Sequence, residues 1–229
     1  MTTHVLYHYP CADGVFGALS AYLYFGAPSA TVKYVGHTVF ANEAQIQVHL
    51  NSFQPQDVLY LIDYCGRQGF IAEACARLSR VVLLDHHKTA AEMLPDLTGC
   101  TNLETVVDMN RSGATISWDY FSGLRPGLGE GHIGLREKLA LVEDNDLWRH
   151  VLPDSKAFAT GVGELKLEFD CEKNPDIFAS LLALKVAEVV ETGRAATEVR
   201  EARIAEVLTA KWTIKLADGK HTHTHVCIS

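Results

Sequence analysis

The chain of 229 residues lacks several features that would place it in a simple class. No apolar run approaches the ~20 residues that a membrane-spanning helix needs, and no basic stretch followed by an apolar one opens the chain. We therefore expect neither a membrane partner nor a secretory signal. The six cysteines form no C-x-x-C pair, which argues against a zinc ribbon or a disulfide scaffold and predicts a reducing, cytoplasmic location.

Positive charge is also scarce. Lys and Arg number 20 against 28 Asp and Glu, which gives a net charge of −8. No general basic field exists for duplex nucleic acid, and only a local basic groove could serve that role. Hydrophobic residues make up 48% of the chain and charged residues 21%, a mix that predicts a folded globular protein.

Short apolar runs alternate with amphipathic stretches of helix length over most of the chain. The runs expected to be strands are residues 5–8, 31–35, 58–62, 81–84 and 103–107. The stretches expected to be helices are residues 14–25, 43–50, 67–78, 112–121 and 133–142. This alternation predicts an α/β fold with a doubly wound, mainly parallel sheet.

The last quarter of the chain has a different pattern. Residues 176–210 have an almost continuously helical composition, with Gly193 as a candidate break. Asp218-Gly219 stands between two alternating runs and predicts a hairpin. We therefore predict a domain at 1–150, a helical segment and connector at 151–211, and a hairpin at 212–229 that starts a smaller C-terminal unit.

Acidic and histidine side chains gather where the predicted strands end, and a further acidic cluster follows the helical run to 142. The residues are His8, Cys11, Asp13, Asp63, Asp85, His86, His87, Asp108, Asp144 and Asp146. Because the carboxyl ends of parallel strands share one edge, these side chains should converge. Convergent carboxylates repel one another unless a cation neutralises them. Oxygen and nitrogen ligands suit Mn²⁺, Mg²⁺, Fe²⁺ or Co²⁺, with Zn²⁺ as an alternative.

Four ordered motifs resemble those of the DHH phosphoesterase superfamily. They read His8-Tyr9-Pro10-Cys11-Ala12-Asp13-Gly14, Leu61-Ile62-Asp63, Leu83-Leu84-Asp85-His86-His87 and Val142-Glu143-Asp144-Asn145-Asp146. That superfamily includes pyrophosphatases, exopolyphosphatases, single-strand exonucleases and hydrolases of very short RNAs and cyclic dinucleotides. The resemblance covers about residues 4–150.

The resemblance implies two divalent metal sites, with manganese as the first expectation, and a role for each motif. It places His8 on the first metal, Asp13 on the second and Asp63 between them. His86 and Asp144 would complete the second site, with Asp146 as the alternative to Asp144. His87 would face the substrate phosphate and Asp85 would orient a histidine. Beside these, Arg111 is a candidate phosphate contact, next to a helix that starts at Ser112 and offers free N–H groups.

The chain departs from the family pattern in two places. Cys11 stands where the family often has an aspartate, and a thiolate suits Zn²⁺ or Fe²⁺ better than Mn²⁺ or Mg²⁺. The motif H-x-x-C-x-D-G resembles an offshoot of the superfamily, so the identity of the first metal stays open. Family members also carry a smaller, substrate-gripping C-terminal domain. Here either the natural chain continues beyond Ser229 or that domain is reduced.

The expected function is metal-dependent hydrolysis of a phosphoester or phosphoanhydride by a metal-activated water. The expected partner is a phosphorylated small molecule or a short single-stranded nucleic acid. Two alternatives stay open: a non-catalytic nucleotide-binding module, and a hydrolase with Cys11 as its nucleophile. Trp148 is expected to pack beneath the site as a core aromatic residue.

Overall fold

A computed structural model describes residues 1–38, 43–209, 212–215 and 222–225. A five-stranded sheet has the order β2-β1-β3-β4-β5, and every neighbouring pair is parallel. The strands are β1 (Thr3–His8), β2 (Val32–His37), β3 (Val58–Ile62), β4 (Arg80–Asp85) and β5 (Leu103–Val107). The predicted α/β class with a parallel sheet is confirmed.

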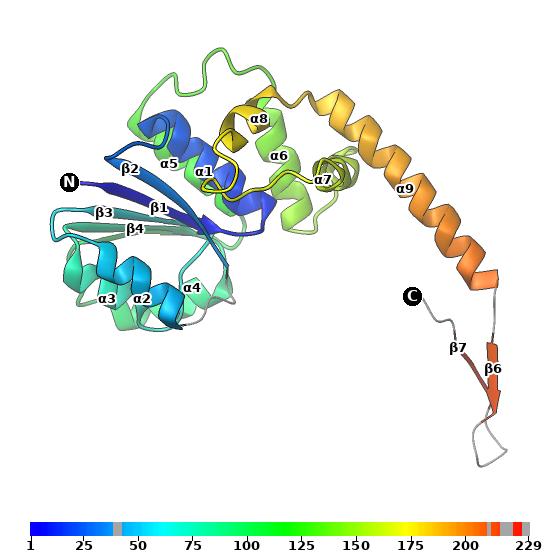
Figure 1. The fold of residues 1–229 in the computed structure, drawn as a ribbon, viewed down its shortest axis with the longest axis horizontal. Coiled ribbons are helices and arrows are strands. Elements are labelled where there is room, and N and C mark those ends of the chain that lie inside the picture. Colours follow the sequence, from blue (N-terminus) through cyan, green and yellow to red (C-terminus); the bar gives the residue numbers. More distant parts are fainter. Residues whose placement is uncertain (39–42, 210–211, 216–221, 226–229) are drawn as a thin grey trace.

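Helices cover both faces of this sheet (Figure 1). One face carries α2 (Glu43–Ser52), α3 (Phe70–Arg77) and α4 (Lys88–Met93), which leads into a 3-10 turn, η1 (Leu94–Leu97). The other face carries α1 (Ala12–Phe25) and α5 (Gly113–Leu124). The chain continues through α6 (Leu135–Asp146), α7 (Ser155–Glu164), α8 (Ile177–Ala183) and α9 (Val186–Thr209).

The central strands are apolar through their middle, as in residues 5–7 and 81–84, because both faces of the sheet are covered. Successive side chains of a strand point to opposite faces. In β1, Val5 and Tyr7 therefore pack in the core under α1 and α5, and Leu6 packs in the core under α3. All three are essentially inaccessible to solvent. This burial holds the strand ends, and any side chain placed on them, in fixed positions.

Helix α9 runs through Gly193 without a break, so the predicted break there is wrong. A Cβ atom at Gly193 would lie 1.8 Å from the carbonyl oxygen of Ala157, and one at Gly161 would lie 2.0 Å from that of Val189. These glycines therefore let α7 and α9 pack backbone against backbone. The interruption of the helical stretch lies instead at residues 184–185, between α8 and α9.

The segments after residue 150 divide into a packed part and a projecting part. Phe158 of α7 and Phe178 of α8 are buried in the same core as β1, and Val189 and Val190 in the first half of α9 join it. The later part of α9 extends away from the body (Figure 1). The strands β6 (Trp212–Lys215) and β7 (Thr222–His225) pair antiparallel, as the predicted hairpin requires. Its Asp218-Gly219 turn lies outside the described residues, and the domain boundaries at 150 and 211 stay predictions.

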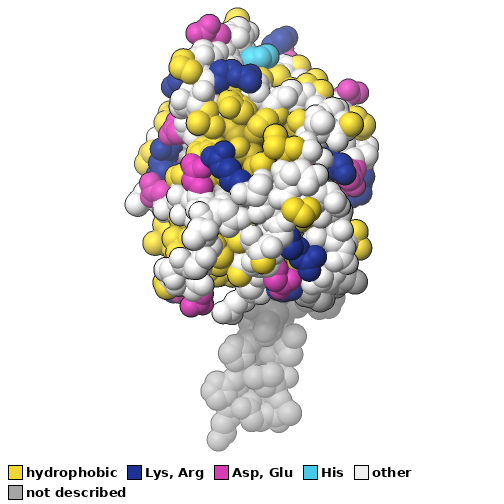
Figure 2. Space-filling view, turned by 90° about the vertical axis from the view of Figure 1, so that its left-hand side faces the viewer, with side chains coloured by type: hydrophobic (Ala, Val, Ile, Leu, Met, Phe, Trp, Pro, Cys, Tyr) yellow, Lys and Arg dark blue, Asp and Glu magenta, His cyan; other side chains and the backbone are white. Residues whose placement is uncertain are grey.

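Hydrophobic side chains gather on the face at the amino ends of the strands (Figure 2). Near these ends the rings of Tyr24, Phe25 and Tyr60 form a chain of contacts, with ring centroids 4.8 Å and 5.2 Å apart. The charged cluster described below lies at the opposite, carboxyl ends. Among the described residues, no helix combines the length and the apolar character needed to cross a membrane.

Candidate metal centre

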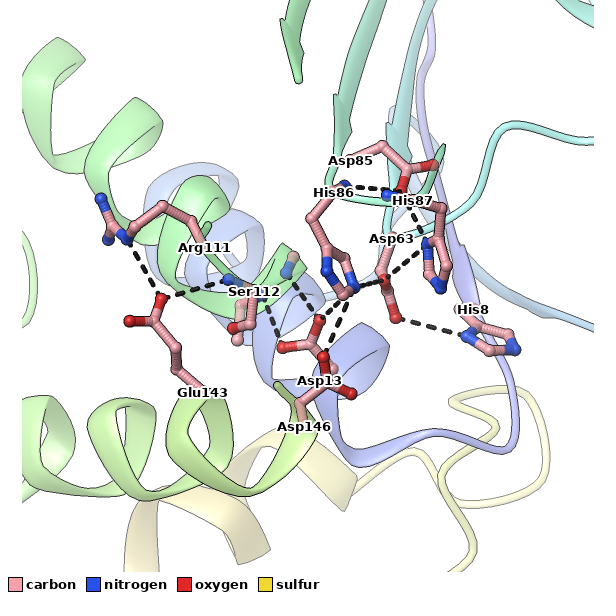
Figure 3. Close-up of polar contacts among 12 residues, drawn as sticks. His8, Asp13, Asp63, Asp85, His86, His87, Arg111, Ser112, Glu143 and Asp146 are labelled. Carbon is pink, nitrogen blue, oxygen red and sulfur yellow. Dashed lines mark hydrogen bonds and ion pairs between the residues drawn. The ribbon is translucent and has the colours of Figure 1, made fainter. Parts of the chain in front are cut away.

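The side chains predicted at the strand ends converge at the carboxyl edge of β1, β3 and β4 (Figure 3). Within the described residues, three overlapping groups have ligand atoms within 4.8 Å of one another. They are His8, Cys11 and Asp63; Asp63, His86 and His87; and Asp13, His86 and Asp146. Asp63 and His86 each belong to two groups, so the donors form one continuous centre.

Asp63 lies in the middle of this centre. It follows β3 directly, is 2% exposed and has a left-handed backbone with φ of 55°, a conformation that aspartate tolerates better than most residues. Its Oδ2 atom lies 3.3 Å from Nδ1 of His8, and its Oδ1 atom lies 3.1 Å from Nε2 of His86. The turn at the end of β3 thus aims one carboxylate at ligands from two other strands.

Buried polar atoms without hydrogen bonds mark the same place. Among the described residues, five buried side-chain atoms form no hydrogen bond: Oγ of Ser117 and Nε1 of Trp118 belong to α5, and the other three are Oδ1 of Asp63, Oδ2 of Asp85 and Nε2 of His86. Oδ1 of Asp63 and Nε2 of His86 lie 3.1 Å apart as an ion pair, but without the geometry of a hydrogen bond. An unsatisfied buried polar atom costs about 1–3 kcal/mol, and more when it is charged. A divalent cation bound between Asp63 and His86 would satisfy both, so the donor set fits a metal ion.

Asp13 is held by the amino end of α5. Its two carboxylate oxygens accept hydrogen bonds from the backbone N–H groups of Gly113, at 2.6 Å, and Ala114, at 2.9 Å. A Cβ atom at Gly113 would lie 2.6 Å from Cβ of Asp63 and 3.0 Å from Oδ2 of Asp13. Glycine is therefore required for α5 to approach the centre. These hydrogen bonds use the N–H groups at the amino end of α5, which the sequence predicted to be free to bind phosphate.

Asp85 organises the two histidines that follow it. Its Oδ1 atom accepts hydrogen bonds from the backbone N–H groups of His86 and His87 and lies 2.8 Å from Nδ1 of His87. The His86 ring points inward toward Asp13, Asp63 and Asp146 (Figure 3). The side chain of His87 is 44% exposed. One imidazole therefore lies inside the donor cluster, and the other lies at its open side.

The predicted ligand Asp144 does not join the centre, and this expectation is wrong. Its carboxylate accepts the backbone N–H groups of Val151, at 3.1 Å, and Leu152, at 3.2 Å, so it fastens the loop between α6 and α7. The alternative, Asp146, has its Oδ2 atom 3.5 Å from Nε2 of His86. The late acidic member of the cluster is therefore Asp146, at the end of α6.

Two further expectations are also corrected. Arg111 is not directed at the centre, because its guanidinium pairs with Asp119 at 2.8 Å and Glu143 at 3.1 Å. Ser112 caps α5 as expected, but its N–H group donates to Glu143. Trp148 does not pack beneath the site: it is 82% exposed.

Glu143 is a residue whose role the sequence did not reveal. It accepts hydrogen bonds from the N–H of Ser112 and from the hydroxyl of Thr115, and it pairs with Arg111 and Arg149. It thereby ties α6 to the amino end of α5, which in turn holds Asp13. Apart from Arg149, these partners lie about 30 residues away along the chain, so the local sequence around Glu143 does not indicate them.

The carboxylates and histidines of the centre shift one another's pKa values. Burial, followed by repulsion from Asp63 and Asp146, raises the pKa of Asp13 well above its usual range. Burial alone would raise the pKa of Asp63, but contacts with His8 and His86 lower it overall. Burial alone would lower the pKa of His86, yet the three surrounding carboxylates raise it to about 9. The hydrogen bond to Asp85 raises the pKa of His87.

Burial, with the neighbouring Asp63 second, raises the pKa of the Cys11 thiol to about 12. In the metal-free protein the thiol is therefore protonated at neutral pH. Cation binding is the condition under which Cys11 would become a thiolate, because a coordinating thiol loses its proton. This chemistry argues for a ligand and against a free nucleophile.

These shifts predict that metal affinity rises with pH. With a pKa of about 9, His86 is protonated at neutral pH in the metal-free protein, and a cation must displace that proton. We expect the apparent Mn²⁺ affinity of the group that contains His86 to rise about tenfold per pH unit from pH 6 to pH 8 and to level off near pH 9, whereas the affinity of the group that contains Cys11 should keep rising because its thiol has a pKa of about 12. Calorimetric titrations at four pH values measure this slope. A flat profile would contradict a protonated His86 as a ligand.

Comparisons with known proteins give neither a family nor an activity. No protein-family model matches the chain. Uncharacterized protein R106 of Acanthamoeba polyphaga mimivirus is 25% identical over 173 residues, or 72% of this chain and 38% of that protein. The chain thus spans well under two thirds of this relative's length. A crystal structure of an uncharacterized protein from Helicobacter pylori G27 aligns with a TM-score of 0.49 and 16% identity, over 65% of this chain and 44% of that one.

Proposed function

We propose that the protein is a hydrolase of phosphoric esters or anhydrides that depends on two divalent cations, with a DHH-type catalytic domain. The observation that carries this proposal is the position of Asp63, whose carboxylate oxygens face His8 and Cys11 on one side and His86 on the other. Two cations that share a ligand need a carboxylate with donor groups on both sides. Asp63 has donors on both sides and an oxygen that forms no hydrogen bond.

In this proposal the ligands divide between two cations. His8 and Cys11 would hold the first, whereas Asp13, His86 and Asp146 would hold the second, with Asp63 between them. Bound divalent cations would lower the pKa of a shared water and stabilise negative charge on the phosphate oxygens. Manganese is the first candidate, and Cys11 favours zinc or iron at the first position.

The chain's own residues prepare the rest of the reaction. Asp85 fixes the His87 ring through Nδ1, which leaves Nε2 to meet a phosphate oxygen or the leaving group at the exposed side. The hydrogen bond to Asp85 raises the pKa of His87, which favours the protonated, donating form of its ring. The amino end of α5 holds Asp13 in place before any cation binds. The strand ends beneath the centre, including Ile62 and Leu84, are buried.

A metal-by-substrate screen tests the proposal. We expect phosphate release from at least one phosphorylated substrate only when Mn²⁺, Fe²⁺, Co²⁺, Zn²⁺ or Mg²⁺ is present, with full loss after chelation and recovery on re-addition. Elemental analysis of the purified protein should find bound metal. Turnover by metal-free protein that stops when Cys11 is alkylated would point to the thiol route. Metal and nucleotide binding without any turnover would point to the binding module.

The two adjacent histidines should respond differently to replacement. His86→Ala removes a buried ligand candidate, so bound metal should fall and the metal concentration needed for half-maximal activity should rise. His87→Ala removes an exposed donor, so metal content should stay the same while kcat falls by about 10²-fold or more. Metal titrations and single-turnover rates separate these outcomes. Equal loss of metal in both variants would refute the division.

A further inference from the structure

A cavity of about 330 Å³ opens directly beside the candidate metal centre. Asp63, Asp85 and His87 form its inner end, and the loop that follows β3 and the first turns of α4 form its walls, including Cys65, Thr89 and Met93. Its lining is mostly apolar. Cavities for small organic ligands span roughly 300–1,000 Å³, so this one matches a ligand at the small end of that range.

The shape of this cavity is fixed by the loop between β3 and α3. Gly66 has φ of 71°, and a Cβ atom there would lie 2.6 Å from the ring of Phe70. Glycine is therefore required at this turn, which places the backbone of residues 64–68 against the cavity. Cys65 Sγ lies 3.9 Å from the hydroxyl of Thr89, which joins the loop to α4. The cavity is thus built from two elements in mutual contact.

The charge of the surroundings argues against an inorganic polyphosphate. Of the described residues that line this cavity, Arg67 alone is a lysine or arginine, and its guanidinium pairs with Glu73 at 2.9 Å. Lys88, next to His87, pairs with Glu92 at 3.2 Å. A second cavity, of about 270 Å³, adjoins Cys11 and Asp146, and its described lining contains no lysine or arginine. Each further phosphate group would bring more negative charge, and the paired Arg67 is the one lysine or arginine in these two described linings that could match it.

We propose that the substrate is an organic phosphate ester whose organic group, about the size of one nucleoside, occupies the cavity beside His87. This inference rests on the proposed function, because the scissile phosphate must lie at the metal centre. A water oxygen forms the new bond to phosphorus, the P–O bond to the organic group breaks, and the leaving oxygen takes up a proton. The products are an organic alcohol and the hydrolysed phosphate. Inorganic pyrophosphate and polyphosphate are poor substrates on this account.

Thr89→Trp and Thr101→Trp form a matched pair for the test. Thr89 is an exposed residue in the first turn of α4, so a tryptophan there fills the cavity without disturbing the core. Thr101 is exposed in the loop before β5 and does not line the cavity. The Mn²⁺-loaded full chain is assayed with thymidine 5′-monophosphate, an ester whose expected products are thymidine and phosphate, and with inorganic pyrophosphate.

We expect the ester to be hydrolysed with at least tenfold higher kcat/KM than pyrophosphate. Thr89→Trp should lower that ratio at least tenfold, mainly through KM for the ester, and Thr101→Trp should preserve it. A preference for pyrophosphate, or equal losses on both substrates in Thr89→Trp, would overturn the inference while leaving metal-dependent hydrolysis intact.

Failure of the proposed function gives a different result: neither compound is hydrolysed with any metal. In that case the inference is tested by calorimetry, which measures the affinity of the Mn²⁺-loaded protein for thymidine 5′-monophosphate and for pyrophosphate. Weaker binding of the nucleotide to Thr89→Trp, relative to pyrophosphate and to Thr101→Trp, would support the cavity as its site. Tighter binding of pyrophosphate, or no effect of Thr89→Trp, would overturn it.

Discussion

Asp63→Asn should abolish metal-dependent turnover, with a loss greater than about 10³-fold, because it removes the carboxylate that faces both donor groups. This exceeds the 10–100-fold usual for losing a partner outside the coordination shell. Asparagine has the same shape and also tolerates the left-handed backbone at this position, so the fold should persist. Elemental analysis should find a loss of bound metal, and circular dichroism should show unchanged secondary structure.

Asp108→Asn provides the matched control. Asp108 also follows a strand of the sheet directly, but its Oδ1 atom accepts the backbone N–H of Asn110 at 2.9 Å and belongs to none of the three donor groups. Asparagine can keep this turn, so metal content and kcat should match those of the unmodified protein. Retained turnover in folded, metal-bearing Asp63→Asn would exclude the bridging role and with it the two-cation proposal.

The sequence predicted the sheet and its polar edge because both depend on local pattern. Continuous apolar runs such as residues 58–62 and 81–84 identify strands buried on two faces, and the residue after each run must emerge at the common edge. Asp63 and Asp85 could therefore be placed from the sequence alone. His8 and His86 could be placed at the same edge, because His8 ends the first predicted strand and His86 follows Asp85 directly.

Other features depend on contacts between distant segments, which local pattern does not contain. Arg111 precedes a helix and resembles a phosphate contact, but Glu143, 32 residues later, accepts its hydrogen bond. Gly193 has the composition of a helix break, but it serves the close approach of α9 to Ala157. In both cases the residue type was informative, and the partner that determines its role was not visible in the sequence.

The choice between Asp144 and Asp146 failed for a related reason. Two positions along a helix differ by about 200° in direction, so only one of these acids can face the centre. The orientation of α6 about its own axis decides which one, and that orientation is set by packing against α5, α7 and α1. Asp144 instead accepts hydrogen bonds from the N–H groups of Val151 and Leu152, and no sequence motif predicts this loop.

Replacing these two acids one at a time should separate metal binding from stability. Asp146→Asn removes a half-buried ligand candidate beside Asp13 and His86, so metal affinity and turnover should fall by about 10²-fold or more, comparable to the loss of one positioned charge. The metal-free protein should be no less stable, because one of three mutually repelling carboxylates is neutralised. Metal titration and thermal unfolding after chelation measure both effects on the same sample.

Asp144→Asn should give the reverse result. The amide keeps one acceptor oxygen but turns an NH₂ group toward a backbone N–H of the loop, so a buried hydrogen bond is lost and two donors face each other. We expect a loss of about 1–3 kcal/mol in the free energy of unfolding, with metal affinity per folded molecule within about threefold of normal. The two variants differ by two residues and share the same chemical change. If Asp144→Asn loses metal while Asp146→Asn loses only stability, the ligand is Asp144, and the orientation of α6 described above is wrong.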